Sequence, residues 1–148
     1  MQAHVTSLGK SVLSPANAVA IGKFGPNKGK LILANGCIDL ISIMDVDTGK
    51  IIRQYGKEYD TTGALDDVTE GPDGTLYFTS LCSEALGYIR PDGTHGKIPI
   101  GKMWSNSICV TLDGKWLFFG LCIGDDQLYR LPLENGLPKK GAKMELVE

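Results

Sequence analysis

The chain has 148 residues, of which 43% are hydrophobic and 22% charged, a composition typical of one globular domain. The formal net charge of −2 and the absence of a Lys/Arg cluster argue against a nucleic-acid or anionic-membrane partner. No apolar run approaches the roughly 20 residues of a membrane span, and the N-terminus lacks the pattern of a signal peptide. We therefore expect a cytoplasmic protein, or a processed mature chain, with no nucleic acid and no membrane among its partners.

In chain order, the sequence predicts a series of short strands joined by glycine-containing turns and no helix of typical length. Residues 3–9 form a short alternating segment that resembles an outermost strand. The turns between first and second strands centre on Gly29, Gly74 and Gly114. Third strands are predicted at 38–46, 86–90 and 127–131, and outer strands at 50–56, 97–101 and 143–147.

These strands repeat at a fixed period. The turn glycines lie 45 and then 40 residues apart, which is the period of a four-stranded propeller blade. We therefore predict an all-β fold: a single, partial β-propeller domain spanning 1–148. Its blades would cover about 14–56, 57–101 and 102–148, with 3–9 as an extra outer strand. The blade cores would contain Leu76 and Phe118 from the second strands.

Three blades cannot close a ring, because propellers typically have four to eight. We expect this chain to be half of a six-bladed ring, with the further blades supplied by a second copy, a companion chain or a longer version of the protein. An isolated half-ring would expose apolar blade faces and strand edges, so we expect a homo-oligomer or a companion chain.

A family resemblance rests on two stretches of the third unit. Residues 106–115 (NSICVTLDGK) and 128–133 (LYRLPL) resemble the gluconolactonase, regucalcin (senescence marker protein) and strictosidine-synthase-like group of six-bladed propellers. The resemblance implies a divalent cation, usually Ca²⁺, at the top of the central channel. By position, the ligands of the first three blades fall on Asn17, Asp66 and Asn106. The family has Glu and Asn at the first two positions, so Asn17 and Asp66 depart from its pattern, and the fourth ligand, an Asp, lies beyond Glu148.

Physical reasoning on the same residues leaves two interpretations open. Inner strand starts converge on one axis, and hard cations such as Ca²⁺ prefer the oxygen ligands that Asn17, Asp66 and Asn106 offer. Alternatively, these side chains cap turns by bonding to nearby backbone. Mg²⁺ and Mn²⁺ would also suit an oxygen site.

A substrate pocket would lie beside this site. Trp104 and Tyr59 occupy the loops that lead into the third and second units, where they either wall a small-molecule pocket or cover the hub. A cysteine follows each turn glycine by eight residues. These three thiols either line the same face or are small packed side chains repeated by duplication: Cys37, Cys82 and Cys122. The remaining acidic candidates near that face are Asp67, Glu70, Asp125 and Asp126.

Two functions from different classes follow. The first is a metal-dependent hydrolase of a small lactone or ester, in which the cation polarises the carbonyl and a carboxylate activates water. The base would come from the missing blades or from Asp67. The second is a non-catalytic propeller that serves as a binding or assembly scaffold, since a shared fold does not transmit chemistry.

Overall fold

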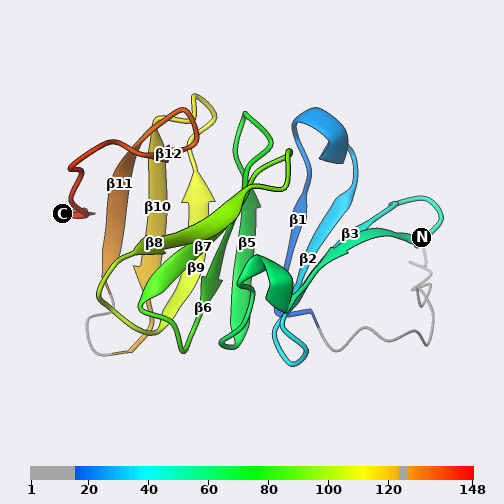
Figure 1. Ribbon diagram of the computed structural model, residues 1–148, viewed down its shortest axis with the longest axis horizontal. Coiled ribbons are helices and arrows are strands. Elements are labelled where there is room, and N and C mark those ends of the chain that lie inside the picture. The colour runs from blue at the N-terminus through cyan, green and yellow to red at the C-terminus, as the bar shows by residue number, and fades with distance from the viewer. Residues whose placement is uncertain (1–15, 124–126) are drawn as a thin grey trace, which may run out of the picture.

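The computed structural model describes residues 16–123 and 127–148 as three antiparallel sheets standing side by side (Figure 1). The all-β prediction is confirmed, and the two helices within these residues are single 3₁₀ turns, η1 (Gly25–Asn27) and η2 (Lys57–Tyr59). The first sheet contains β1 (Ala18–Ile21), β2 (Leu31–Asn35), β3 (Leu40–Met44) and β4 (Ile51–Tyr55). The second contains β5 (Leu65–Glu70), β6 (Leu76–Ser80), β7 (Ala85–Ile89) and β8 (His95–Pro99). The third contains β9 (Ser105–Val110), β10 (Trp116–Leu121) and β11 (Leu128–Glu134).

In each sheet the strands just named form a meander, each pairing with the next along the chain. The first strands meet at the inner edge, where β5 lies against both β1 and β9, and β4 and β8 form the outer edges. Two short strands complete the third sheet by pairing with β11, namely β12 (Leu137–Pro138) and β13 (Glu145–Leu146). The predicted extra strand at 3–9 lies outside the described residues.

The blades are held together by two apolar clusters, one in each space between neighbouring sheets. The first joins Ile32, Ile41 and Tyr55 of the first sheet to Val68 and Phe78 of the second. The second cluster joins the opposite face of the second sheet to the third. Because each fully buried large side chain contributes about 1.5–3 kcal/mol, these two contacts dominate the stability of the blade stack.

The predicted core position of Leu76 is correct, but that of Phe118 is wrong. Leu76 is 2% exposed, whereas Phe118 is half-buried and its neighbour Phe119 is fully buried. Because alternate residues of a strand face opposite sides of the sheet, Phe119 enters the interface with the second blade. Phe118 therefore lies on the other face of β10, opposite Arg130 of β11.

A buried carboxylate joins the first two blades at the end of β5. Glu70 is 7% exposed, and its Oε2 accepts hydrogen bonds from the backbone N–H groups of Lys23 (2.8 Å) and Phe24 (3.0 Å). Its Oε1 accepts a third from the Asn27 side-chain amide at 3.0 Å. The expected place of Glu70 beside the strand starts is therefore wrong: it lies at the opposite end of β5 from Asp66.

Candidate functional site

The predicted ligand residues occupy equivalent positions in the three blades. In each blade, the next-to-last residue of the inner strand pairs with a residue near the start of the second strand. These pairs are Ala20–Ile32, Thr69–Tyr77 and Cys109–Phe118. Three residues before each inner-strand position stand Asn17, Asp66 and Asn106. The strand pairing therefore supports the repeat alignment that the sequence suggested.

Backbone irregularities mark these positions. The pairing of β5 with β6 shifts between Leu65 and Val68, around Asp66, and that of β9 with β10 shifts at Gly120/Leu121, opposite Asn106. Such bulges bend a strand and redirect the side chains of the extra residue. The polar side chains thus stand where the regular alternation of the inner strands is interrupted.

Asn17 and Asp66 are in direct contact across the first two blades. The Asn17 Nδ2 group donates a hydrogen bond to Asp66 Oδ1 at 3.2 Å, in an exposed position. The space behind Asn17 requires a glycine, because a Cβ at Gly36 would lie 2.7 Å from Asn17 Nδ2 and 2.4 Å from the Leu65 carbonyl oxygen. The turn after β2 therefore approaches the next blade and the Asn17 amide too closely for any side chain at position 36.

The donor set fits a hard divalent cation in its chemistry. Asn17, Asp66 and Asn106 offer amide and carboxylate oxygens, the ligands that Ca²⁺ takes. Within 16–123 and 127–148, no three His, Cys, Asp or Glu side chains gather into a metal-binding group, so such a site depends on the amide oxygens. The Asn17 amide presents its nitrogen to Asp66, and a bound cation would replace this hydrogen bond by turning the amide oxygen inward.

Asp67 is tied to the backbone of two blades. Its Oδ1 accepts a hydrogen bond from Val68 N at 2.8 Å, and its Oδ2 accepts one from Ile108 N at 2.9 Å. Burial raises the pKa of the Asp67 carboxyl above its ordinary value, and the charge of Asp66 adds to this, while the two N–H donors oppose it. A raised pKa suits a proton acceptor, but both oxygens already accept backbone hydrogen bonds, and Oδ2 does so across the contact between the second and third blades.

The two aromatic candidates lie apart. Trp104 directly precedes β9, adopts a left-handed backbone (φ 67°) and is 37% exposed, beside the predicted ligand Asn106. Tyr59 instead packs edge-on against Tyr55 and His95, each with ring centroids 5.0 Å apart. Since those partners belong to the outer strands β4 and β8, the structure places Tyr59 at the rim between two blades.

The three repeated cysteines differ in position and exposure. Cys37 and Cys82 are exposed and Cys122 is half-buried, so the expectation of uniformly packed thiols does not describe them. Cys122 N donates to the carbonyl of Trp104, whereas the equivalent bond in the second blade comes from Leu81 N to Ala64. Cys122 thus corresponds to Leu81 and not to Cys82, because the turn of the third blade holds one more residue.

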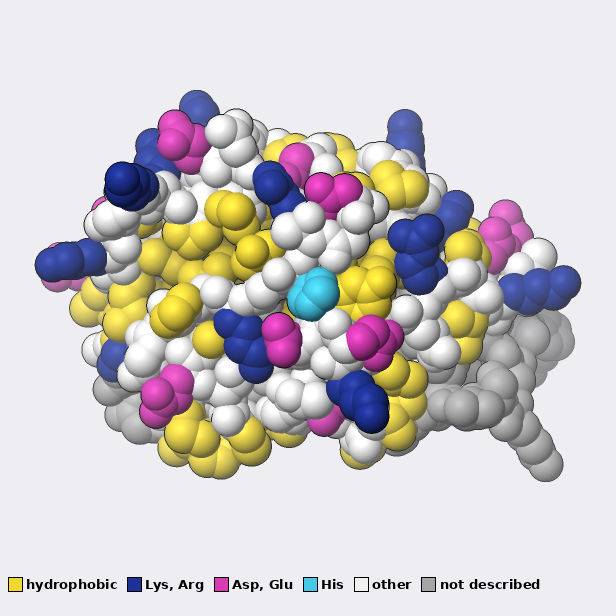
Figure 2. All heavy atoms as spheres, in the orientation of Figure 1, with side chains coloured by type: hydrophobic (Ala, Val, Ile, Leu, Met, Phe, Trp, Pro, Cys, Tyr) yellow, Lys and Arg dark blue, Asp and Glu magenta, His cyan; other side chains and the backbone are white. Residues whose placement is uncertain are grey.

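An apolar groove lies on the outer side of the molecule, away from these residues. Figure 2 shows hydrophobic side chains gathered over β8 and β12, where a hollow of about 350 Å³ is present. Tyr88, Pro99 and Leu137 are among the residues that line it. The hollow lies between outer strands of adjacent blades and shares no lining residue with the inner strand starts.

Comparison with known proteins finds relatives in fold. No protein-family model and no curated protein matches the sequence, so no family match accompanies the resemblance to gluconolactonase and regucalcin. Virginiamycin B lyase from Staphylococcus aureus matches with a TM-score of 0.67 and 18% identity, over 94% of this chain and 42% of that one. Hydrazine synthase from Kuenenia stuttgartiensis gives 0.69 and 14%, over 99% of this chain and 40% of that one. A candidate 6-phosphogluconolactonase from Bacteroides fragilis gives 0.59 and 16%, over 84% and 40%.

These likenesses define the class of fold: the chain is part of a β-propeller, with three blades whose inner strands begin at one shared face. The chain spans about two fifths of the length of the solved structures it matches. No helix within 16–123 and 127–148 is long and apolar enough to cross a membrane.

Proposed function

We propose that this chain is the three-blade part of a metal-dependent hydrolase of a small lactone or ester, completed by a second copy or a companion chain. The observation that carries the proposal is the equivalence of Asn17, Asp66 and Asn106, each of which stands three residues before the equivalent paired positions Ala20, Thr69 and Cys109 of the inner strands. A divalent cation held there would polarise the carbonyl of a bound ester, and Ca²⁺ is the cation that we propose.

The chain's own residues would divide the remaining tasks. Asp66 supplies the negative charge of the ligand set, and Asn17 and Asn106 supply neutral oxygens. Trp104, half-exposed beside β9, offers an apolar wall for the substrate. The water-activating base would come from the added blades, or from Asp67, whose pKa is raised by burial.

The fold relatives share the propeller fold, and two of them are described as enzymes. One of them is described as a 6-phosphogluconolactonase candidate and another as a lyase. A non-catalytic scaffold is the second candidate, and the hydrogen bonds of Asp67 favour it. A carboxylate that accepts backbone hydrogen bonds from two blades has an evident structural task.

Calcium binding is the first test. We expect the chain to bind Ca²⁺ in a calorimetric titration and the Asn106→Ala variant to lose at least about tenfold in affinity, since an oxygen ligand is removed. Ser107→Ala is the matched control, because Ser107 is the adjacent exposed residue of β9 and is not in the ligand set. Equal affinities of Asn106→Ala and the parent chain would refute the site.

Ring completion and hydrolysis form the second part of the experiment. Native mass measured with and without Ca²⁺ should show two copies or a companion chain, and lactone hydrolysis should appear only in that assembly. A folded monomer that binds Ca²⁺ and hydrolyses no lactone would leave the scaffold as the function.

A further inference from the structure

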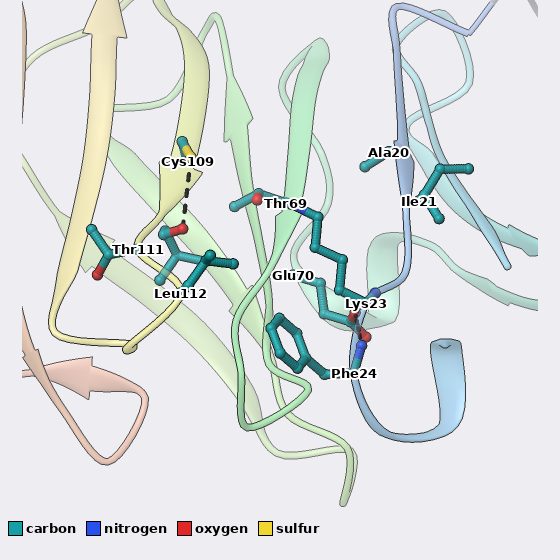
Figure 3. A pocket seen from close by; sticks show the side chains of 10 residues that line it. Ala20, Ile21, Lys23, Phe24, Thr69, Glu70, Cys109, Thr111 and Leu112 are labelled. Atoms are coloured by element: carbon teal, nitrogen blue, oxygen red, sulfur yellow. Dashed lines mark hydrogen bonds between the residues drawn. The ribbon is translucent and has the colours of Figure 1, made fainter. Parts of the chain in front are cut away.

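A second cavity lies at the other end of the inner strands. It has a volume of about 220 Å³ and is lined by the last residues of β1, β5 and β9 together with the loop after β1 (Figure 3). All three blades contribute to it, and the predicted cation ligands stand at the opposite ends of the same strands. The cavity is smaller than the roughly 300–1,000 Å³ of drug-sized pockets, which indicates a small ligand.

One positive charge reaches into this cavity. Figure 3 shows the Lys23 side chain extended across it toward Thr69. Among the described residues, no carboxylate forms a salt bridge with Lys23, and the Thr69 hydroxyl has no hydrogen-bond partner. Lys23 and Thr69 therefore bring an ammonium and a hydroxyl to the same cavity, where both remain available to a ligand.

The other polar groups of the cavity are already engaged. Both oxygens of Glu70 accept N–H groups of the loop that follows β1. The Thr111 hydroxyl donates to Asp113 at 2.6 Å and accepts from Trp116 N at 3.1 Å. Both oxygens of Glu70 are thus occupied as acceptors, and Lys23 remains the charged group with free donors for a ligand.

The rest of the lining is apolar. Phe24 and Ile21 come from the first blade, and Leu112, which is 71% exposed, comes from the turn of the third blade. Figure 3 shows Leu112 on the β9 side of the cavity, across from Lys23 and Phe24. A ligand held at Lys23 and Thr69 would therefore place the remainder of its structure against hydrophobic side chains.

We propose that this cavity binds a small monocarboxylic acid with an apolar tail. The carboxylate accepts charge-assisted hydrogen bonds from the Lys23 ammonium and the Thr69 hydroxyl, and the tail packs against Phe24 and Leu112. The site is independent of the proposed cation site, because it uses the opposite ends of the inner strands and needs no further blades.

Hexanoate is a suitable probe, with hexanamide and hexylammonium as neutral and cationic analogues of the same tail. In calorimetric titrations of the 148-residue chain we expect hexanoate to bind at least about tenfold more tightly than either analogue, as a hydrogen bond to a charged group requires. Added salt should weaken hexanoate binding, because Lys23 is exposed and dissolved ions screen its attraction to the carboxylate. Inorganic phosphate should compete poorly, since it lacks the tail.

Lys23→Gln should lower hexanoate affinity about tenfold and leave hexanamide binding unchanged. Lys28→Gln is the matched control, because Lys28 is an exposed lysine of the same loop that does not line the cavity. Leu112→Ser tests the tail, and both residues are exposed enough for these variants to fold. Undetectable hexanoate binding, equal binding of hexanamide, or unchanged affinity in Lys23→Gln would each overturn the proposal.

Discussion

Removal of the Glu70 carboxylate is the sharpest test of how the first two blades are joined. Glu70→Ala leaves three N–H donors without their acceptor: the backbone groups of Lys23 and Phe24 and the amide of Asn27. An unsatisfied buried donor costs about 1–3 kcal/mol, and solvent can reach part of this loop. We therefore expect the free energy of unfolding to fall by about 3–5 kcal/mol.

Glu70→Gln separates the shape of the side chain from its charge. One amide oxygen can still accept from both backbone N–H groups, and the amide nitrogen then faces Asn27 Nδ2. Asn27 can turn its oxygen toward that nitrogen, so we expect a loss of only about 1–2 kcal/mol. Asn27→Asp should restore part of this loss in the double variant, because its carboxylate accepts from the new amide.

Urea unfolding at one fixed protein concentration measures these differences, since association would otherwise alter apparent stability. Glu84→Ala is the control: Glu84 is exposed, and its substitution should stay within about 0.5 kcal/mol. A loss below about 1 kcal/mol in Glu70→Ala would show that the carboxylate does not hold the blades together.

Two further predictions concern the core and the inner strands. Phe119→Ala should lower the free energy of unfolding by about 3–5 kcal/mol, because it opens a cavity between blades. Phe118→Ala, on the other face of β10, should lower it by less than half as much. Equal losses in urea unfolding would contradict this assignment of faces. Burial raises the pKa of Asp67, so the native state holds this proton more tightly than the unfolded chain, and the resulting stability is lost as pH rises from about 4. The stability of Asp67→Asn relative to the parent should therefore increase with pH over that range, and a constant difference would count against the pKa shift.

The sequence predicted the repeated architecture because each blade carries the same short-range information. Glycine turns and apolar strands recur with a fixed period, and the meander of each sheet follows from short connections. The start of each inner strand could also be located, since Asn17, Asp66 and Asn106 each precede an equivalent paired residue by three positions.

Positions that depend on a one-residue difference could not be predicted from the period. Gly71 N bonds to the Thr75 carbonyl, whereas Thr111 N bonds to that of Trp116, so the third turn is longer by one residue. A shift of one residue moves every following side chain to the other face of a strand. Because of this difference, a fixed period predicts a core position for Phe118 that Phe119 occupies, and equal spacing from the turn glycines does not make Cys82 and Cys122 equivalent.

Contacts between blades were equally hidden from the sequence. Glu70 is a β5 residue whose partners lie 43 to 47 positions earlier, in a loop with no distinctive pattern. The loop closes tightly over it, since a Cβ at Gly22 would lie 1.9 Å from the Asn27 carbonyl oxygen. Only the packing of two blades against each other shows that this carboxylate is structural.

The two ends of the inner strands differ in how far they depend on further blades. At the starts, the exposed Asn17 amide donates to the half-buried Asp66 carboxylate, so a bound cation would have to replace this hydrogen bond. Of the three expected ligands in this chain, only Asp66 carries a negative charge. At the other ends, Glu70 is fully satisfied and Lys23 is left with an apolar cavity beside it. Cation binding should therefore strengthen when the ring is completed, whereas carboxylate binding should be present in the three blades alone.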